Sequence, residues 1–172
     1  MKLLTLIRHA KSSWKELGME DSARPLNRRG KRDAVTMGQR LAVIGFMPDS
    51  LISSPARRAR STARRLAKEI GYEKSRIAFN EGIYHAGTDQ LLRIVRSVDD
   101  AYGNVALVGH NPGFTDLSNM LSRDFVGELP TCAIVRLQLD VTSWRDVERK
   151  CGILIDFDFP KRDAEGTASL TT

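Results

Sequence analysis

The stretch that decides the fold is Leu3-Leu4-Thr5-Leu6-Ile7-Arg8-His9-Ala10, at the start of the chain. Its short apolar run predicts a buried strand, and the strand ends abruptly at a cation and an imidazole. In open α/β sheets, functional sites form beyond the carboxyl ends of the strands. His9 is therefore placed where a nucleophile or base is useful, and Arg8 where an anion is bound. Taken alone the pair is a weak signal, and a solvated arginine beside a loop histidine is the simpler interpretation.

Composition indicates one globular domain. The chain has 172 residues, of which 41% are hydrophobic and 28% charged, which is enough to bury a substantial core. We expect a single domain over residues 1–160 and a flexible, polar tail over residues 161–172. No apolar run approaches the roughly 18 residues of a membrane span, and the first run is too short for a signal peptide. We therefore expect a cytoplasmic protein with no membrane partner.

The net charge and the cysteine content restrict the classes of partner and of metal site that we expect. The net charge of +6 arises from 27 Lys and Arg against 21 Asp and Glu, which suits an acidic partner such as a phosphorylated substrate. Nucleic acid is the competing interpretation, but aromatic residues are only 6% and none interrupts the basic run from Arg57 to Arg65. We therefore expect no nucleic-acid partner. Cys132 and Cys151 lack the spacing of a metal site and are expected to be reduced core residues.

Helix-like and strand-like segments alternate along the rest of the chain. Periodicity, caps and breakers predict helices over residues 28–44, 56–70, 90–98 and 114–122, and strands over residues 49–53, 76–79 and 104–109. Asn27 is expected to cap the first helix, and Thr88 or Asp89 the third.

Two late segments, 131–140 and 153–159, alternate with a period of two residues and are separated by a polar loop. The second places four apolar residues on one side, namely Ile153, Ile155, Phe157 and Phe159. The late segments predict an antiparallel edge on a mostly parallel sheet. The sequence therefore predicts an α/β fold.

Three predicted strand ends carry the residues of a phosphate site. His110 ends the strand over residues 104–109 as His9 ends the first, and Arg58 lies in the first turn of a helix that follows another strand. The N–H groups of that turn also favour anions. Two guanidinium groups can clamp a phosphoryl group, while one neutral imidazole attacks phosphorus and the other stabilises developing charge. This chemistry requires no metal and no cofactor, and the sequence offers no obvious carboxylate cluster for a metal.

These residues resemble the signature of a known family, the histidine phosphatase superfamily of phosphoglycerate-mutase-like proteins. Arg8-His9-Ala10 resembles its RHG motif, and residues 53–63 resemble its SSPxxRAxxTA segment. Residues 25–30 resemble its PLTxxG segment, and residues 108–112 its second-histidine segment. The resemblance covers most of the chain, in the expected order. It implies a three-layer α/β/α sandwich, with His9 as the phosphorylated nucleophile and Arg8, Arg58 and His110 as the phosphate pocket.

Three segments, residues 8–14, 109–113 and 129–131, resemble the small SixA-type phosphohistidine phosphatases. Ala10 replaces the motif glycine, so the backbone there is expected either in a region open to any residue or slightly shifted. Trp14-Lys15 stands where mutases often carry asparagine, which argues against sugar-phosphate mutase activity. His110 is followed by Asn111, whereas the acid-phosphatase branch has an aspartate there.

Glu81 is the candidate general acid. It lies roughly where many family members carry a catalytic glutamate, and the alternative is a surface carboxylate. A serine or sugar alkoxide needs a proton donor to leave, whereas a phosphohistidine with a protonated ring needs far less help. If Glu81 is not poised for catalysis, phosphohistidine becomes the natural substrate. His85 is either a further pocket donor or exposed, and we favour exposure.

We therefore expect a metal-independent and cofactor-independent phosphatase that acts through phospho-His9 on phosphohistidine proteins. One alternative is a small phosphomonoesterase acting on phosphorylated metabolites or on phosphoserine and phosphothreonine. An alternative of another class is a non-catalytic phosphate-binding adaptor, against which the presence of both His9 and His110 argues. The sequence leaves the oligomeric state open.

Overall fold

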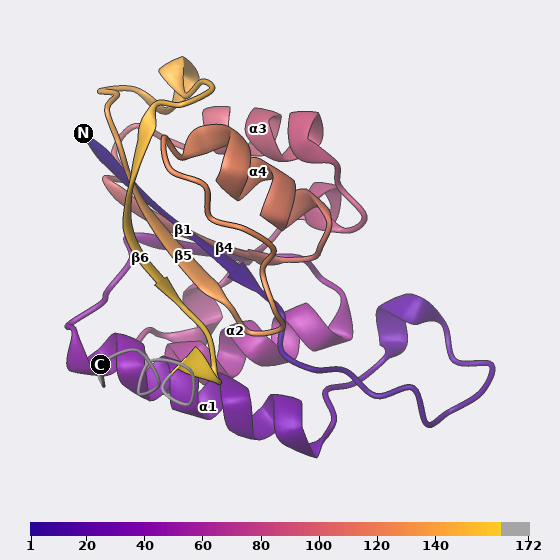
Figure 1. Cartoon of the computed structure of the whole chain (residues 1–172). Coiled ribbons are helices and arrows are strands. Elements are labelled where there is room, and N and C mark those ends of the chain that lie inside the picture. Colours follow the sequence, from indigo (N-terminus) through magenta and orange to yellow (C-terminus); the bar gives the residue numbers. More distant parts are fainter. Residues whose placement is uncertain (163–172) are drawn as a thin grey trace, which may run out of the picture.

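The computed structural model describes residues 1–162, so most of the expected tail, residues 163–172, lies outside the described residues. A six-stranded sheet forms the centre (Figure 1), in the order β3-β2-β4-β1-β5-β6. The strands are β1 (Lys2–Arg8), β2 (Ser50–Ser53), β3 (Ala78–Phe79), β4 (Asn104–Gly109), β5 (Ile134–Leu139) and β6 (Gly152–Asp158). Strands β1 to β4 are parallel to one another, and at one edge of the sheet β5 pairs antiparallel with both β1 and β6. The predicted mixed sheet is confirmed.

Within residues 1–162, four helices cover the two faces of this sheet. They are α1 (Arg28–Val43), α2 (Arg57–Ile70), α3 (Thr88–Arg96) and α4 (Gly113–Leu121). In Figure 1, α1 and α2 lie on one face and α3 and α4 on the other. The α/β/α sandwich is therefore confirmed. No helix within residues 1–162 is long and apolar enough to cross a membrane.

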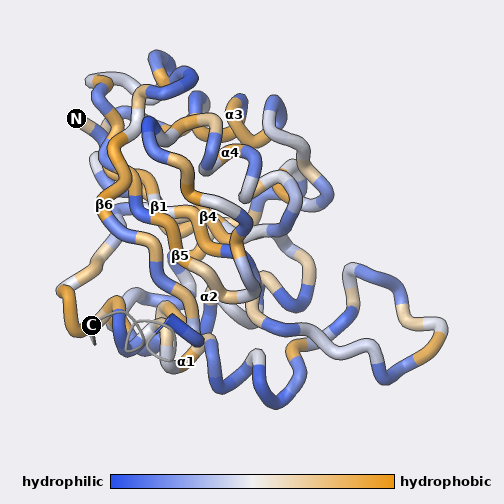
Figure 2. The backbone as a smooth tube through the Cα atoms, in the orientation of Figure 1, coloured by the Kyte–Doolittle hydropathy of each residue, from blue (hydrophilic) through white to orange (hydrophobic). Residues whose placement is uncertain are grey.

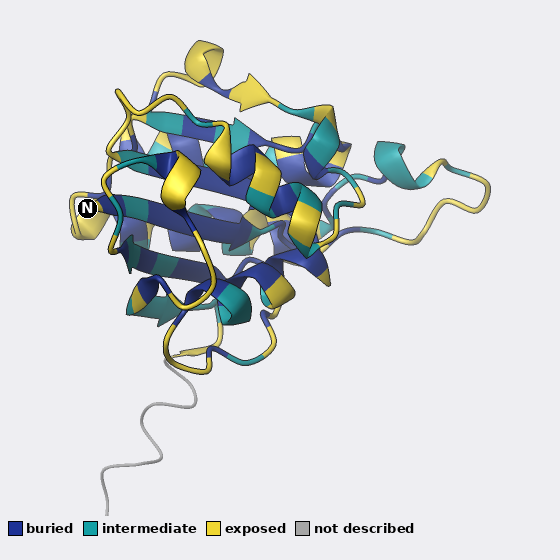
Figure 3. Ribbon diagram, turned by 90° about the horizontal axis from the view of Figure 1, so that it is seen from above, coloured by how far each residue is buried: buried dark blue, intermediate teal, exposed yellow. Residues whose placement is uncertain are grey.

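Alternation along the strands divides the core between the two faces. On β1, Leu4 and Leu6 pack in the cluster under α3 and α4, whereas Ile7 packs in the cluster under α1 and α2. Successive strand residues point to opposite faces, so an unbroken apolar run is buried on both. Figure 2 shows this hydrophobic centre along β1 and β4, and Figure 3 shows its burial between helices with exposed outer sides.

The helix ends follow the expected chemistry with one shift. The Asn27 side chain accepts a hydrogen bond from the Gly30 amide and caps α1. Gly71, with φ of 74°, ends α2 in the left-handed conformation that glycine tolerates. The third helix starts earlier than predicted, because Thr88 is already helical and Gly87 is the N-cap, without a side-chain hydrogen bond.

A β-bulge overturns the expected alternation of β6. Arg136 pairs with Asp156 but Leu137 pairs with Leu154, so Ile155 is an extra residue on β6. A bulge of this kind reverses the faces beyond it. Phe157 and Phe159 consequently pack against the core, while Ile153 and Ile155 stay 44% and 45% exposed.

The loop between β5 and β6 also contains a core residue that periodicity does not predict. Trp144 lies in a short 3-10 turn and is completely buried. Its indole N–H donates to the Tyr102 carbonyl over 2.8 Å. Cys132 and Cys151 are both buried and free, as expected.

Candidate active site

The two predicted histidines meet because their strands are neighbours. Arg8 of β1 lies opposite Gly109 of β4, so the residues that follow each strand emerge side by side. The imidazole centroids of His9 and His110 are 5.1 Å apart, with the rings tilted by 57°. The neighbouring strand β2 leads into α2, whose first turn carries Arg58. The structure therefore brings Arg58 and both histidines together as the sequence predicts.

His9 is held in one orientation at the end of β1. Its Nδ1 lies 2.8 Å from the Ala10 carbonyl oxygen, and Arg58 Nε lies 3.2 Å from its Nε2. A carbonyl accepts and a guanidinium donates, so the neutral ring carries its proton on Nδ1 and a lone pair on Nε2. Burial is the main cause that lowers the pKa of His9, to about 4, and the charges of Arg58 and Arg8 add to it against the opposing effect of the Ala10 carbonyl. His9 is therefore neutral at pH 7.

His110 is also neutral and buried. Its Nε2 lies 2.7 Å from the Ser54 hydroxyl oxygen, whereas its buried Nδ1 has no hydrogen-bond partner within residues 1–162. Burial, followed by the proximity of His9 and of Arg58, lowers the pKa of His110 to about 3. Buried polar atoms nearly always have partners, so the Nδ1 atom is an exception among the buried groups around His9.

Arg58 is fixed by a carboxylate that the sequence did not reveal. Its Nη1 donates to the Asp21 carbonyl over 2.7 Å, and its Nη2 donates to Asp21 Oδ2 over 2.9 Å. Asp21 also accepts from the Tyr84 hydroxyl over 2.7 Å and from Arg24 Nη1 over 2.9 Å. Partial burial opposes ionisation, but the hydrogen bonds from Tyr84, Arg24 and Arg58 lower the pKa of Asp21 far below its ordinary value. Asp21 is thus a permanent negative charge among cations.

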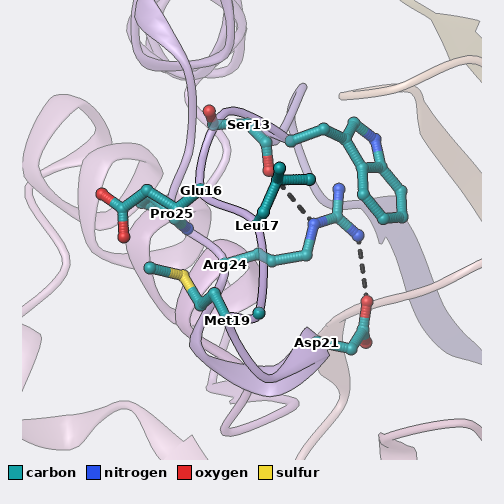
Figure 4. A pocket seen from close by; sticks show the side chains of 9 residues that line it. Ser13, Glu16, Leu17, Met19, Asp21, Arg24 and Pro25 are labelled. Carbon is teal, nitrogen blue, oxygen red and sulfur yellow. Dashed lines mark hydrogen bonds and ion pairs between the residues drawn. The ribbon is translucent and has the colours of Figure 1, made fainter.

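The carboxylate is delivered by the segment over residues 11–25, which projects beside the sheet in Figures 1 and 3. Arg24 ties this segment together (Figure 4), because its Nε donates to the Ser13 carbonyl and its Nη1 to Asp21. The Arg24 guanidinium also lies 3.2 Å from the centroid of the Trp14 indole. In the sequence, only the i, i+3 spacing of Asp21 and Arg24 indicates this ion pair, because the surrounding residues form an ordinary polar segment.

Backbone packing returns the segment to the site. A Cβ atom on Gly30 would lie 2.0 Å from the carbonyl oxygen of Lys11, so only glycine lets α1 approach the chain just beyond His9. Ala10 is fully buried and its amide donates to Thr62 Oγ1 over 3.0 Å. Ala10 is not among the residues with positive φ, so the expectation for its backbone is confirmed.

Arg8, the last residue of β1, lines a groove toward the segment before β5 and the end of β6. Its Nη1 donates to the Leu129 carbonyl over 2.7 Å, which also accepts from Asn111 Nδ2 over 3.0 Å. The Nε of Arg8 is buried without a hydrogen-bond partner within the described part of the chain. Arg8 directly precedes His9 in the chain, and its charge contributes to lowering the pKa of His9.

Glu81 is not joined to them. It begins a 3-10 turn over Glu81–Ile83, its side chain is exposed, and the structure gives it no hydrogen bond or ion pair within residues 1–162. Tyr84 and His85 reach Asp21 from the same region instead, with His85 Nε2 3.7 Å from Asp21 Oδ2 and its side chain 69% exposed. His85 is therefore exposed, as favoured. Within residues 1–162, no group of three or more His, Cys, Asp or Glu side chains is placed to share a metal ion.

Comparison with known proteins agrees with this geometry. The family model of the histidine phosphatase superfamily (branch 1) matches residues 4–82. A chloroplastic protein of Arabidopsis thaliana, itself uncharacterized, is 30% identical over 151 residues, which are 83% of this chain and 69% of that protein. The chain belongs to the histidine phosphatase superfamily.

Solved structures of this superfamily place the chain beside its SixA-type members. A protein of Agrobacterium tumefaciens assigned as the phosphohistidine phosphatase SixA aligns with a TM-score of 0.75 and 27% identity, over 91% of this chain and 97% of that one. The protein histidine phosphatase SixA in complex with tungstate aligns with a TM-score of 0.74 and 18% identity, over 92% and 97%, and shares the fold. The family match and these neighbours support phosphatase activity, and the predicted resemblance to the SixA-type branch is confirmed.

Proposed function

We propose that this histidine phosphatase removes phosphate from phosphohistidine in proteins, through a phosphorylated His9. The observation that carries the proposal is the state of His9, which is buried, neutral and oriented with its Nε2 lone pair toward the Arg58 guanidinium. A neutral imidazole is a nucleophile, and a cation beside its attacking nitrogen attracts the phosphoryl group that it attacks.

In the first step, Arg8, Arg58 and His110 surround the phosphoryl oxygens. His9 Nε2 attacks phosphorus in line, and the bond between phosphorus and the substrate imidazole breaks. The substrate ring keeps the electron pair of that bond and leaves as a neutral imidazole, because its other nitrogen already carries a proton. The two guanidinium groups stabilise the charge on the equatorial oxygens, while the Ala10 carbonyl keeps the His9 ring fixed through Nδ1.

In the second step, water attacks the phosphorus of phospho-His9. The bond between phosphorus and Nε2 breaks, its electron pair returns to His9, and a proton of the water passes to the departing phosphate. The enzyme is regenerated with the same tautomer, and the net reaction consumes one water for each phosphate released.

The proton donors near the two histidines support this substrate class. No carboxyl group within residues 1–162 hydrogen-bonds to His9 or His110. Asp21 stays ionised and accepts from Arg58, Arg24 and Tyr84, so it has no proton to give. An alkoxide needs such a proton, but a protonated phosphohistidine does not. The similarity to a SixA described as a protein histidine phosphatase, bound to the oxyanion tungstate, supports the same substrate class.

The test is phosphate release from a phosphohistidine peptide and a phosphoserine peptide, each offered to the wild type and to His9→Asn. We expect release from phosphohistidine that drops at least about 10³-fold in the variant, as for other nucleophiles, and an acid-labile phosphate on the wild-type chain after rapid quenching. Arg64→Ala, an exposed arginine on α2, serves as the control and keeps wild-type turnover.

Three outcomes would contradict the proposal. Comparable release from phosphoserine would make the protein a phosphomonoesterase and restore Glu81 as general acid. Phosphate binding without release from either peptide would make it a phosphate-binding adaptor. Turnover that survives in His9→Asn would exclude His9 as the nucleophile.

A further inference from the structure

A groove at the antiparallel edge of the sheet has Arg8 among its lining residues. Its volume is about 490 Å³, and its walls come from the start of α1, the segment before β5 and the end of β6. Ligand sites in proteins have volumes of about 300 to 1,000 Å³, so the groove can take several groups of a bound chain. Because Arg8 belongs both to the groove and to the proposed phosphate pocket, a ligand whose phosphate lies in that pocket can continue into the groove.

One wall of the groove is apolar. Phe157 and Phe159 line it with ring centroids 5.4 Å apart, and both are partly buried against the core. Leu129, which is completely buried, also lines the groove. The bulge at Ile155 produces this wall, since it turns the two phenylalanines away from the face that carries Ile153.

Cationic side chains also line the groove. Arg8, Arg29 and Lys161 line it, against a single lining carboxylate, Glu128. Arg29 Nε lies 3.4 Å from Asp33 Oδ2, which offsets part of its charge. Lys161 is exposed and has no ion pair within residues 1–162. The lining residues therefore carry a net positive charge, which attracts a carboxylate that approaches the groove.

We propose that this groove binds the peptide segment that flanks the phosphohistidine, and that it selects segments with both a carboxylate and an apolar side chain. The carboxylate faces Arg29 and Lys161, and the apolar side chain packs on Phe157 and Phe159. This proposal rests on the proposed function, because the phosphohistidine fixes the position of the segment. It makes sequence context, and not only phosphohistidine itself, a determinant of the substrate.

The test compares four substrates: free phosphohistidine, and phosphohistidine peptides whose flanks contain Glu and Leu, only Ala, or Lys and Leu. We expect the wild type to have its lowest KM for the Glu and Leu peptide. In the double charge reversal R29E/K161E that KM rises about tenfold, the size expected from two exposed charge contacts turned into repulsions. The KM for the Lys and Leu peptide falls, and the values for free phosphohistidine do not change.

The matched control is R64E/K68E, which makes the same change in net charge on an exposed part of α2 and leaves the order of the substrates unchanged. Phe159→Ala raises the KM of the Glu and Leu peptide and spares free phosphohistidine. Equal KM values for all peptides in the wild type, or a charge reversal that shifts all substrates alike, would overturn the groove while leaving the proposed function intact. Failure to hydrolyse free phosphohistidine and every peptide would instead overturn the proposed function.

Discussion

The two histidines and Arg58 are held in the site by different kinds of structure. His9 and His110 follow adjacent parallel strands, and the register of β1 with β4 fixes their separation. Arg58 lies in the first turn of α2, but its guanidinium is fixed by Asp21, which comes from the projecting segment over residues 11–25. The sheet thus sets where the attacking group lies, and the segment sets how the phosphate-binding cation is oriented. The contributions of the sheet and of the segment can be tested separately by substitution.

The largest effect is expected where the segment is tied to the helices. Gly30→Ala places a Cβ atom 2.0 Å from the Lys11 carbonyl oxygen and 2.8 Å from its nitrogen. Backbone atoms cannot step aside as a flexible side chain does, so we expect a loss of about 3 kcal/mol in the free energy of unfolding and a marked loss of turnover. Denaturant unfolding followed by circular dichroism measures the first. Gly87→Ala is the control, because no heavy atom lies within 4 Å of its added Cβ, and equal stabilities of the two variants would contradict the packing argument.

The burial of the two histidines at the strand ends can be tested through the pH dependence of the free energy of unfolding. Unfolded histidine has a pKa near 6.5, whereas the folded pKa is about 4 for His9 and about 3 for His110. Below pH 6.5 the unfolded chain binds more protons, so this contribution to stability is complete above pH 6.5 and is lost as the pH falls toward 4. For His9 the loss is about 3 kcal/mol, at about 1.4 kcal/mol per unit of pKa.

Unfolding free energies measured between pH 7 and pH 4 check this slope. The double variant H9N/H110N lacks both imidazoles and is expected to lose less stability over the same range. A wild type and a double variant with the same pH dependence would show that burial does not keep the two imidazoles neutral.

Sequence reasoning succeeded where one strand end determines one side chain. The apolar runs before His9 and His110, and the helix start at Arg58, can each be recognised from neighbouring residues in the sequence alone. Asp21 could not be found in this way, because it meets Arg58 across 37 residues through a segment without hydrophobic period. The faces of β6 were predicted wrongly for a related reason, since one unpaired residue, Ile155, reverses a period of two.

The smallest expected effect is on kcat/KM in two variants that separate the charge of Asp21 from its hydrogen bonds. Asp21→Asn keeps the shape but replaces one acceptor oxygen by an amide that donates toward Arg58 or Tyr84, so Arg58 loses its charged partner. We expect kcat/KM for a phosphohistidine peptide to fall about tenfold. Tyr84→Phe removes one donor but leaves the ion pair of 2.9 Å between Asp21 and Arg58, so its loss is about threefold.

Melting temperatures of both variants should stay close to that of the wild type, because Asp21 is 38% exposed and lies outside the hydrophobic core. If Asp21→Asn matched the exposed control Arg64→Ala in kcat/KM, Arg58 would be oriented by its own helix and by His9 alone. The projecting segment would then be a cover over the pocket and not a part of it, and the sheet would position every reacting group. A loss larger in Tyr84→Phe than in Asp21→Asn would assign the orienting role to the tyrosine instead.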